Sequence, residues 1–364
     1  MREALLNYFP AIATAFLTAF VIVVWFVPKV RDFAIKIDAV QHGGGRRIHK
    51  GSMPNIGGIA IFLGFLVALL LTSTFYPGLL DVYRVELLAI TVGAALMTLV
   101  GFIDDLWEVP PAMRLASQFL AAGILVVNGV KVDFITNYFA AGDYVYFGQT
   151  AAVLVTLLWV VGFTNAFNFI DGLDGLSSGV ATISSFSLLA VAVQFPDRGA
   201  AILLLTALAG ASLGFLRHNF SPAKIIMGDS GAYLLGYVLA AVSVLGALKV
   251  SAAVTVAAPI LILALPVVNI TQVTLRRLSK GVSPVEASND HLHDLIRIRS
   301  GSKQFTVISL WLVALALGVL GMFLSNTPTM LLNITVVTTV LSITMVCVLR
   351  LVELRRERIK TLGG

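Results

Sequence analysis

Long runs of apolar residues, separated by short polar segments, dominate this chain. A helix that crosses a lipid bilayer needs about 20 mostly apolar residues. Eleven stretches meet this measure: 9–28, 56–75, 86–103, 115–130, 150–166, 176–195, 200–216, 230–248, 252–275, 304–325 and 328–350. The pattern therefore predicts an all-α, polytopic integral membrane protein with about eleven transmembrane helices.

Two stretches depart from plain helices. Pro259 and Pro266 fall inside the stretch 252–275, where we expect them to bend the helix, because proline removes a backbone hydrogen bond. Residues 132–148 alternate aromatic side chains with Asp and Gly, a pattern typical of an external loop with a small hairpin. No linker divides the chain, so we expect a single transmembrane domain over 1–364. Its polar loops are 29–55, 104–114, 167–175, 217–229 and 276–303.

The composition excludes a soluble or a disordered protein. Of the 364 residues, 58% are hydrophobic and only 12% are charged, whereas a soluble domain has about 25% charged residues. Disorder needs the opposite bias. Cys347 is the only cysteine, which excludes an intrachain disulfide or a thiolate metal cluster.

The positive charges indicate the orientation in the membrane. Twenty of the 25 Lys and Arg residues lie in alternate loops, which are the five polar loops and the tail from Arg350. The positive-inside rule assigns these segments to the cytoplasm. We therefore expect the N-terminus outside and the C-terminus inside. The net charge of +6 reflects this topology, and we expect no nucleic-acid partner.

Several carboxylates stand at the ends of predicted spans. "GFIDDLWEV" places Asp104 and Asp105 directly after an apolar run, and "IIMGDSGAY" places Asp229 just before one. Ionisable groups so close to lipid are costly and indicate a functional site. Two simpler interpretations stay open: the pair could only mark the membrane interface, and Asp229 could only cap a helix.

The motif "NAFNFIDGLDGL" is harder to explain by structure alone. It places Asn165, Asn168, Asp171 and Asp174 within a segment that is too polar and too rich in glycine for a good transmembrane helix. Amide and carboxylate oxygens are the ligands that Mg²⁺ prefers, and Mg²⁺ commonly binds one or two carboxylates together with substrate phosphates. The motif therefore predicts a magnesium site and a phosphate-bearing substrate.

Two predicted cytoplasmic loops supply matching cationic groups. "GGGRRIHKGSMPNIGG" contains Arg46, Arg47 and His49 without the spacing of a P-loop. "SNDHLHDLIRIRS" contains His291 and His293, for which a phosphate or sugar contact, a zinc pair and a solvated loop all stay open.

Together the motifs favour phosphoryl transfer from a soluble donor to a membrane-embedded acceptor, at one cytoplasmic face. Two other classes of function were weighed. A cation-coupled transporter would place its polar groups at mid-membrane depth and on both sides. A structural scaffold would leave "NFIDGLDGL" unexplained.

The motifs in this order carry a family resemblance. They are Asp38, Arg46-Arg47-x-His49, Pro54-x-x-Gly57-Gly58, Asp104-Asp105, "NAFNFIDGLDGL", "MGDSG" and His291-x-His293. The chain resembles the polyprenyl-phosphate N-acetylhexosamine-1-phosphate transferases of glycosyltransferase family 4, and within them the WecA-type branch.

The resemblance implies a reaction and its participants. Such enzymes transfer GlcNAc-1-phosphate from UDP-GlcNAc to undecaprenyl phosphate and release UMP, at the start of O-antigen, common-antigen or teichoic-acid synthesis. It implies Mg²⁺, with Mn²⁺ as a substitute, and a bacterial inner membrane with the active site on the cytoplasmic face. Partners are then membrane lipid and, as in many such enzymes, a second copy of the chain. Another UDP-N-acetylhexosamine as donor would leave the motifs unchanged.

The resemblance also assigns roles to residues. Asp229 would be the principal Mg²⁺ ligand with Asn168 as the second, and Asp104 and Asp105 would deprotonate or orient the lipid phosphate. The expected catalytic residues are thus Asp104, Asp105 and Asp229. The expected substrate-binding residues are Asn165, Asn168, Asp171, Asp174, His291, His293, Arg46, Arg47, His49 and Arg114. The translocase for the muramyl-pentapeptide substrate has three consecutive histidines and a basic residue closer to the Asp pair, so their absence here argues against that substrate.

Overall fold

The computed structural model describes residues 2–41, 53–136, 144–195, 197–247, 257–279 and 291–362, and it is almost entirely helical. The helices are α1 (Arg2–Lys36), α2 (Gly58–Phe75), α3 (Pro77–Leu80), α4 (Arg84–Trp107), α5 (Pro111–Val127), α6 (Gln149–Ile170), α7 (Leu176–Ala192), α8 (Gly199–Asn219), α9 (Gly228–Ala247), α10 (Ala257–Ile262), α11 (Ala264–Ser279), α12 (Leu292–Ser300), α13 (Lys303–Leu324) and α14 (Thr329–Leu362), with a 3₁₀ turn η1 (Asp81–Tyr83). The predicted all-α class is confirmed.

Two small antiparallel pairs complete the described structure. β1 (Val40–Gln41) pairs with β2 (Met53–Pro54), and β3 (Phe134–Thr136) pairs with β4 (Tyr144–Tyr146). The second pair confirms the hairpin predicted within 132–148.

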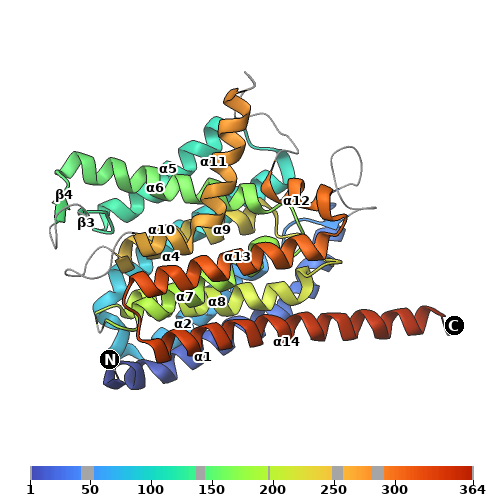
Figure 1. Cartoon of the computed structure of the whole chain (residues 1–364), viewed down its shortest axis with the longest axis horizontal. Helices are drawn as coiled ribbons and strands as arrows, with labels where there is room; N and C mark the ends of the chain where they lie inside the picture. The colour runs from blue at the N-terminus through green and yellow to red at the C-terminus, as the bar shows by residue number, and fades with distance from the viewer. Residues whose placement is uncertain are drawn as a thin grey trace.

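The long helices run roughly along one axis of the molecule, and α11 crosses their direction (Figure 1). The N-terminus and the β3–β4 hairpin lie at one end of this axis, and the C-terminus lies at the other (Figure 1). Since α1 and α14 start at the same end and each crosses the bundle once, the two termini come to lie at opposite ends.

The described chain is built to cross a membrane several times. Eight helices are long and apolar enough to do so, namely α1, α2, α4, α6, α8, α9, α13 and α14. The apolar helices α5 and α7 are shorter. Large apolar side chains such as Leu120, Leu158 and Leu312 are exposed on the outside of the bundle. Such a surface suits lipid, in which apolar side chains need no cover and helices satisfy their own backbone.

Helices α8 and α9 form the buried centre. Residues 199–216 of α8 are all buried, as expected for a helix that is apolar on every side. Small residues allow its neighbours to approach: a Cβ on Gly210 would lie 2.4 Å from the Phe16 carbonyl oxygen of α1. By contrast, only 11% of the most apolar window of α14 is buried.

Two prolines inside the helices, Pro28 and Pro266, leave carbonyl groups that accept hydrogen bonds from side chains of other helices. Pro28 cannot donate to the Val24 carbonyl, and His218 Nε2 lies 3.1 Å from that oxygen. Helix α1 therefore continues to Lys36, past the predicted boundary at 28. Pro266 cannot donate to the Ile262 carbonyl, and Ser184 Oγ donates to it at 3.2 Å.

The predicted bend in 252–275 is therefore a break between α10 and α11, at Leu263. At other predicted loops, too, the helices extend farther into the polar segments than predicted. Asp104 and Asp105 lie in the last turn of α4, the loop 276–303 contains α12, and the tail from Arg350 continues α14. Hydropathy marks the apolar part of a helix, whereas the backbone hydrogen bonds continue into the polar part.

Candidate active site

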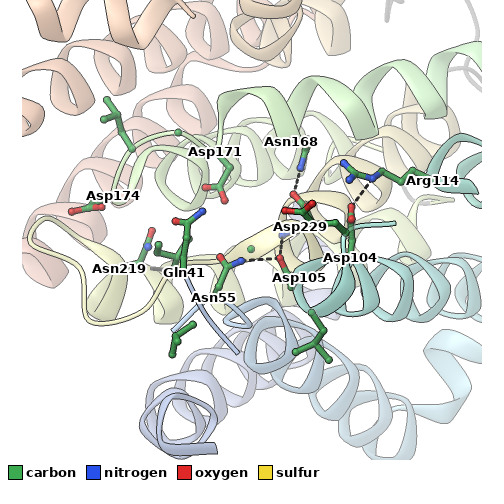
Figure 2. A pocket seen from close by; sticks show the side chains of 17 residues that line it. Gln41, Asn55, Asp104, Asp105, Arg114, Asn168, Asp171, Asp174, Asn219 and Asp229 are labelled. Atoms are coloured by element: carbon green, nitrogen blue, oxygen red, sulfur yellow. Dashed lines mark hydrogen bonds and ion pairs between the residues drawn. The ribbon is translucent and has the colours of Figure 1, made fainter. Parts of the chain in front are cut away.

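One end of the bundle holds a cavity of about 570 Å³. It lies where α4, α6 and α8 end and where α5 and α9 begin, because consecutive antiparallel helices return to the same end. Its polar lining residues are Gln41, Asn55, Asp104, Asp105, Glu108, Arg114, Asn168, Asp171, Asp174, Asn219 and Asp229. In Figure 2, Asp171, Asp174 and Asn219 lie on one side, and Asp104, Asp105, Asn168, Arg114 and Asp229 gather on the other. We call Asp104, Asp105, Asp171, Asp174 and Asp229 the acidic cluster.

The start of α9 is held by a carboxylate from α4. The Asp229 N–H donates to Asp105 Oδ1 at 2.7 Å, and the Ser230 N–H donates to Asp105 Oδ2 at 3.1 Å. Asn55 Nδ2 donates to the same Oδ1 at 3.2 Å. Asp105 therefore caps α9 from a neighbouring helix, so the Asp229 carboxylate is not needed as the cap.

Glycine makes this arrangement possible. Gly228 has φ +73°, and a Cβ there would lie 2.1 Å from the Asn55 carbonyl oxygen. A Cβ on Gly101 of α4 would lie 2.4 Å from the Ser230 nitrogen, so α4 and α9 can cross this closely only at a glycine. The motif "MGDSG" thus lets the Asp229 carboxylate reach the cavity, where Asn168 Nδ2 donates to its Oδ1.

Asp104 is also engaged by the protein. It is only 5% exposed and accepts hydrogen bonds from the Val109 N–H at 2.8 Å and the Tyr233 hydroxyl at 3.1 Å. Arg114 Nε lies 2.9 Å from its Oδ2. Asp104 and Asp105 therefore make tertiary hydrogen bonds, and they are not a solvated pair that only marks the membrane interface.

The turn between α6 and α7 brings the other carboxylates of the cluster. Asp174 Oδ2 accepts the Ala223 N–H at 3.2 Å, and Asn219 Oδ1 accepts the Gly175 N–H at 2.9 Å. The pKa of Asp171 is raised to about 7, mainly because the carboxyl is removed from water; the charges of Asp229 and Asp174 add to the rise, and a hydrogen bond from Ser177 opposes it. A free carboxylate here is costly, so the site favours a bound cation or proton.

The two histidines lie beside this turn and do not line the cavity. Their rings stack, with centroids 5.2 Å apart and planes at 6°. Asn269 of α11 holds this segment, because its Oδ1 accepts the Leu292 N–H at 2.9 Å and its Nδ2 donates to the Phe169 carbonyl at 3.1 Å. We call His291, His293, Asn269 and Asp294 the histidine cluster.

His293 packs directly against the turn. A Cβ on Gly172 would lie 2.1 Å from His293 Nε2. Burial lowers the pKa of His293 to about 4, although Asp294 opposes the shift, and His291 and Arg297 add to it. The ring is therefore neutral near pH 7. The predicted contact of both histidines with phosphate or sugar stays a prediction.

Other predicted site residues fall elsewhere. Asn165 does not line the cavity; its Nδ2 donates to Gln118 Oε1 at 2.6 Å, and Gln118 Nε2 donates back to its Oδ1 at 3.3 Å. This pair joins α5 to α6. Arg46, Arg47 and His49 lie outside the described residues.

The cavity suits a hard divalent cation. Six of its described lining residues are acidic and Arg114 alone is basic. Five of the six are partly or fully buried, and such an excess of negative charge is costly unless a cation balances it. Within the described ranges, no three His, Cys, Asp or Glu side chains form a ready metal cage. Mg²⁺ needs no such cage, because it commonly binds one or two carboxylates and completes its shell with water and phosphate oxygens.

Asn168 fits the same donor set. Its amide nitrogen faces Asp229 in the structure, and a rotation of the amide about its terminal bond would present the oxygen instead. Asp229 and Asn168 would thus hold Mg²⁺.

Sequence reasoning missed several residues of the site. Asn55 donates a hydrogen bond to Asp105, and it could have been identified from the sequence because it stands inside the "PNIGG" motif. Asn219, Tyr233 and Asn269 are buried polar residues of α8, α9 and α11 whose partners lie on other segments, so no local sequence signal could have identified them.

Comparison with known proteins agrees with this geometry. The family described as "Glycosyl transferase family 4" matches residues 87–247, which run from α4 to α9 and include the whole acidic cluster. A Bacillus subtilis protein named "Probable undecaprenyl-phosphate N-acetylglucosaminyl 1-phosphate transferase" is 34% identical over 318 residues, which are 86% of this chain and 85% of that protein.

Two other relatives carry different names. A decaprenyl-phosphate N-acetylglucosaminephosphotransferase of Mycolicibacterium smegmatis is 34% identical over 83% of this chain and 80% of its own length. A phospho-N-acetylmuramoyl-pentapeptide-transferase of Shouchella clausii is 28% identical over 82% of this chain and 91% of its own length.

Proposed function

The chain belongs to glycosyl transferase family 4 and is a phosphotransferase, and we propose that it transfers GlcNAc-1-phosphate from UDP-GlcNAc to undecaprenyl phosphate. The products would be UMP and a lipid-diphosphate-GlcNAc that starts a cell-surface polysaccharide. The observation that carries this proposal is the acidic cavity at one end of an apolar helical bundle. A cavity of this kind can hold the phosphates of a soluble donor, while the surrounding helices lie in the membrane that contains the acceptor.

The proposed reaction exchanges one phosphate bond for another. An oxygen of the lipid phosphate bonds to the sugar-linked phosphorus of UDP-GlcNAc, and the bond from that phosphorus to the bridging oxygen breaks. UMP leaves with the bonding electrons. Catalysis of such a transfer consists mainly of positioning and charge stabilisation, because the protein has little covalent chemistry to do.

The residues of the acidic cluster would divide this work. Mg²⁺, held by Asp229 and Asn168, would neutralise the phosphate charge that approaches the cluster. Asp105 would fix Asp229 through the start of α9, and Asp104 would hold the Arg114 guanidinium at the cavity wall. A phosphate monoester has a second pKa of about 6, so the acceptor needs little help to ionise. We therefore assign orientation, rather than deprotonation, to the Asp pair.

The proposal places the cavity at the cytoplasmic face of a bacterial inner membrane. The excess of Lys and Arg on the loops at that end supports this side. Arg46, Arg47 and His49 belong to one of these loops and would add positive charge for the diphosphate.

The donor and the lipid need a direct test. The purified protein in lipid nanodiscs would receive UDP-GlcNAc, UDP-GalNAc or UDP-MurNAc-pentapeptide, each with undecaprenyl or decaprenyl phosphate. We expect UMP release and a lipid-diphosphate product with UDP-GlcNAc and undecaprenyl phosphate, lost with EDTA and restored by Mg²⁺ or, in part, by Mn²⁺.

Two outcomes would contradict the proposal. Faster turnover of another donor would reassign the sugar while keeping the chemistry. Accumulation of a solute in proteoliposomes, with no UMP formed from any donor, would support a transporter instead.

A further inference from the structure

We propose that the far end of α14 is a positioning element for the active site, acting through Glu353 and Arg350. The inference rests on the proposed function, since α14 would position the side of the cavity that holds Asp171 and Asp174, where we place the nucleotide sugar and which we call the nucleotide-sugar side. Neither residue lines the cavity. They act instead on the segment 220–227 between α8 and α9, which we call the α8–α9 loop.

The α8–α9 loop touches the site at several points. The Ala223 N–H donates to Asp174 Oδ2 at 3.2 Å, so the loop fixes one member of the acidic cluster. The Ile226 N–H donates to the Pro54 carbonyl at 2.8 Å, which holds the loop beside the residue preceding Asn55. The loop then runs directly into Gly228 and Asp229.

Helix α14 holds the loop from the side away from the cavity. Arg350 is only 2% exposed, and its guanidinium donates to the Pro222 carbonyl at 2.8 Å. Glu353 accepts a hydrogen bond from Lys224 Nζ at 2.7 Å, lies 3.7 Å from Arg217, and pairs with Arg350 at 3.3 Å. A carboxylate thus bridges three cations, two of which flank or belong to the loop.

The role of α14 as a membrane-crossing helix does not explain these ion pairs and hydrogen bonds. Most of the helix faces outward, and very little of its apolar window is buried. An arginine that is almost fully buried at the polar end of such a helix therefore has a local purpose. Its contacts are with the loop backbone and with Glu353, and both lead to the loop that donates to Asp174 and runs into Asp229.

The consequence is a specific kinetic signature. Asp229 is held independently by Asp105, so a loosened loop leaves the reacting end of the site largely in place. The loop donates directly to the Asp174 carboxylate through the Ala223 N–H, so the nucleotide-sugar side changes more. We expect Glu353→Gln to raise the KM for UDP-GlcNAc by about five- to tenfold, to change kcat less than about twofold, and to leave the KM for the lipid phosphate unchanged.

The experiment compares Glu353→Gln, Lys224→Met and the double variant with Arg356→Gln, an exposed charge change on the same helix. If Glu353 and Lys224 act as one contact, the double variant raises KM no further than either single variant. Arg356→Gln should behave as the wild type. Arg350→Met should give the largest loss, and the Glu353 variant keeps the test open if that protein does not fold.

Hydrogen exchange provides a readout that needs no substrate. In Glu353→Gln, the backbone amides of 220–227 should exchange faster, while those of α8 stay unchanged. Unchanged exchange in the loop together with an unchanged KM would overturn the proposal, as would an equal effect of Arg356→Gln. If the wild type released no UMP from any donor, the proposed function would fail, and the exchange of the loop would still decide whether α14 holds it.

Discussion

The acidic cluster and the histidine cluster meet at the turn between α6 and α7, yet they are constructed in opposite ways. Asp104 and Asp105 accept hydrogen bonds from backbone N–H groups, and Asp104 forms an ion pair with Arg114, so their charge organises the helices around them. His293 is neutral near pH 7 and fits by shape against Gly172. Charge holds the first cluster in place, and close packing holds the second.

This difference suggests different duties within the proposed reaction. Carboxylates on the ends of α4 and α9 are anchored within the buried centre of the bundle, as a metal site needs. The histidine cluster is joined to that centre mainly by Asn269 and Gly172. Substitutions in the acidic cluster should therefore lower kcat, whereas substitutions around the histidines should raise KM or shift a pH dependence.

The largest effect in the acidic cluster is expected for Asp229→Asn. The substitution removes the negative charge proposed to hold Mg²⁺ and keeps the shape of the side chain. We expect kcat for UMP release to fall by on the order of 10³-fold. Asp133→Asn, an exposed change in the hairpin region at the other end of the bundle, is the matched control. Full activity of the Asp229 variant would end the assignment of this residue to the reaction.

A smaller loss is expected at Asp105, which lines the cavity and whose main described contacts hold the start of α9 and so Asp229. Asp105→Ala leaves the Asp229 and Ser230 N–H groups without their acceptor, and we expect kcat to fall by about 10- to 100-fold. Asp105→Asn keeps one acceptor oxygen and should recover part of the activity. A loss at Asp105→Asn as large as that at Asp229→Asn would instead indicate a direct catalytic role for Asp105.

The histidine cluster can be disturbed without substituting a histidine. A Cβ at Gly172 must displace the His293 ring, whereas Gly162 on α6 has open space around its Cβ position. Gly172→Ala should raise the KM for UDP-GlcNAc by several-fold, with Gly162→Ala equal to the wild type. Equal KM values for the two variants would show that the position of His293 does not matter for donor binding.

The smallest effect is a pH dependence of stability. The pKa of His293 is about 4 in the folded protein, below the ordinary value of 6.5, because burial disfavours the charged ring against the pull of Asp294. The unfolded chain therefore binds a proton first as the pH falls. As the pH falls from 6.5 to 4, we expect the titration of His293 to lower the free energy of unfolding by about 1.4 kcal/mol per pH unit.

The measurement is the apparent melting temperature at pH 7 and pH 5. It should fall with pH in the wild type and fall less in His293→Gln, which cannot take up the proton. His291, Asp294 and Arg297 face the same ring and stay unchanged in both proteins, so their own titration largely cancels in the difference. An identical fall in both proteins would mean that His293 is not the buried neutral ring described.

Much of the fold could be predicted because lipid imposes a simple requirement. Each of the eleven apolar stretches contains a helix, and 252–275 contains α10 and most of α11. Helix ends were less predictable. The continuation of α1 through Pro28 depends on His218, which is distant in the sequence, and no local pattern shows that such a donor is available.

The residues that line the candidate site could largely be predicted from the sequence, but the contacts between them could not. Asp104, Asp105, Asn168, Asp171, Asp174 and Asp229 were identified as unusual residues at span ends, and all line one cavity. That Asp105 caps α9, or that Asn165 pairs with Gln118, depends on which helices are neighbours. Motif position placed both Asn165 and Asn168 among the substrate-binding residues, whereas in the structure Asn168 lines the cavity and Asn165 does not.

The sequence by itself determined that this protein lies in lipid, that it is helical, and which chemical groups its site contains. These properties follow from composition and local spacing, because the cost of placing polar groups in lipid applies to each residue separately. The tertiary structure decided which carboxylates face the cavity, which ones hold other elements, and how α14 reaches the α8–α9 loop. Those properties depend on pairs of residues far apart in the chain, whose distances are set only when the helices pack.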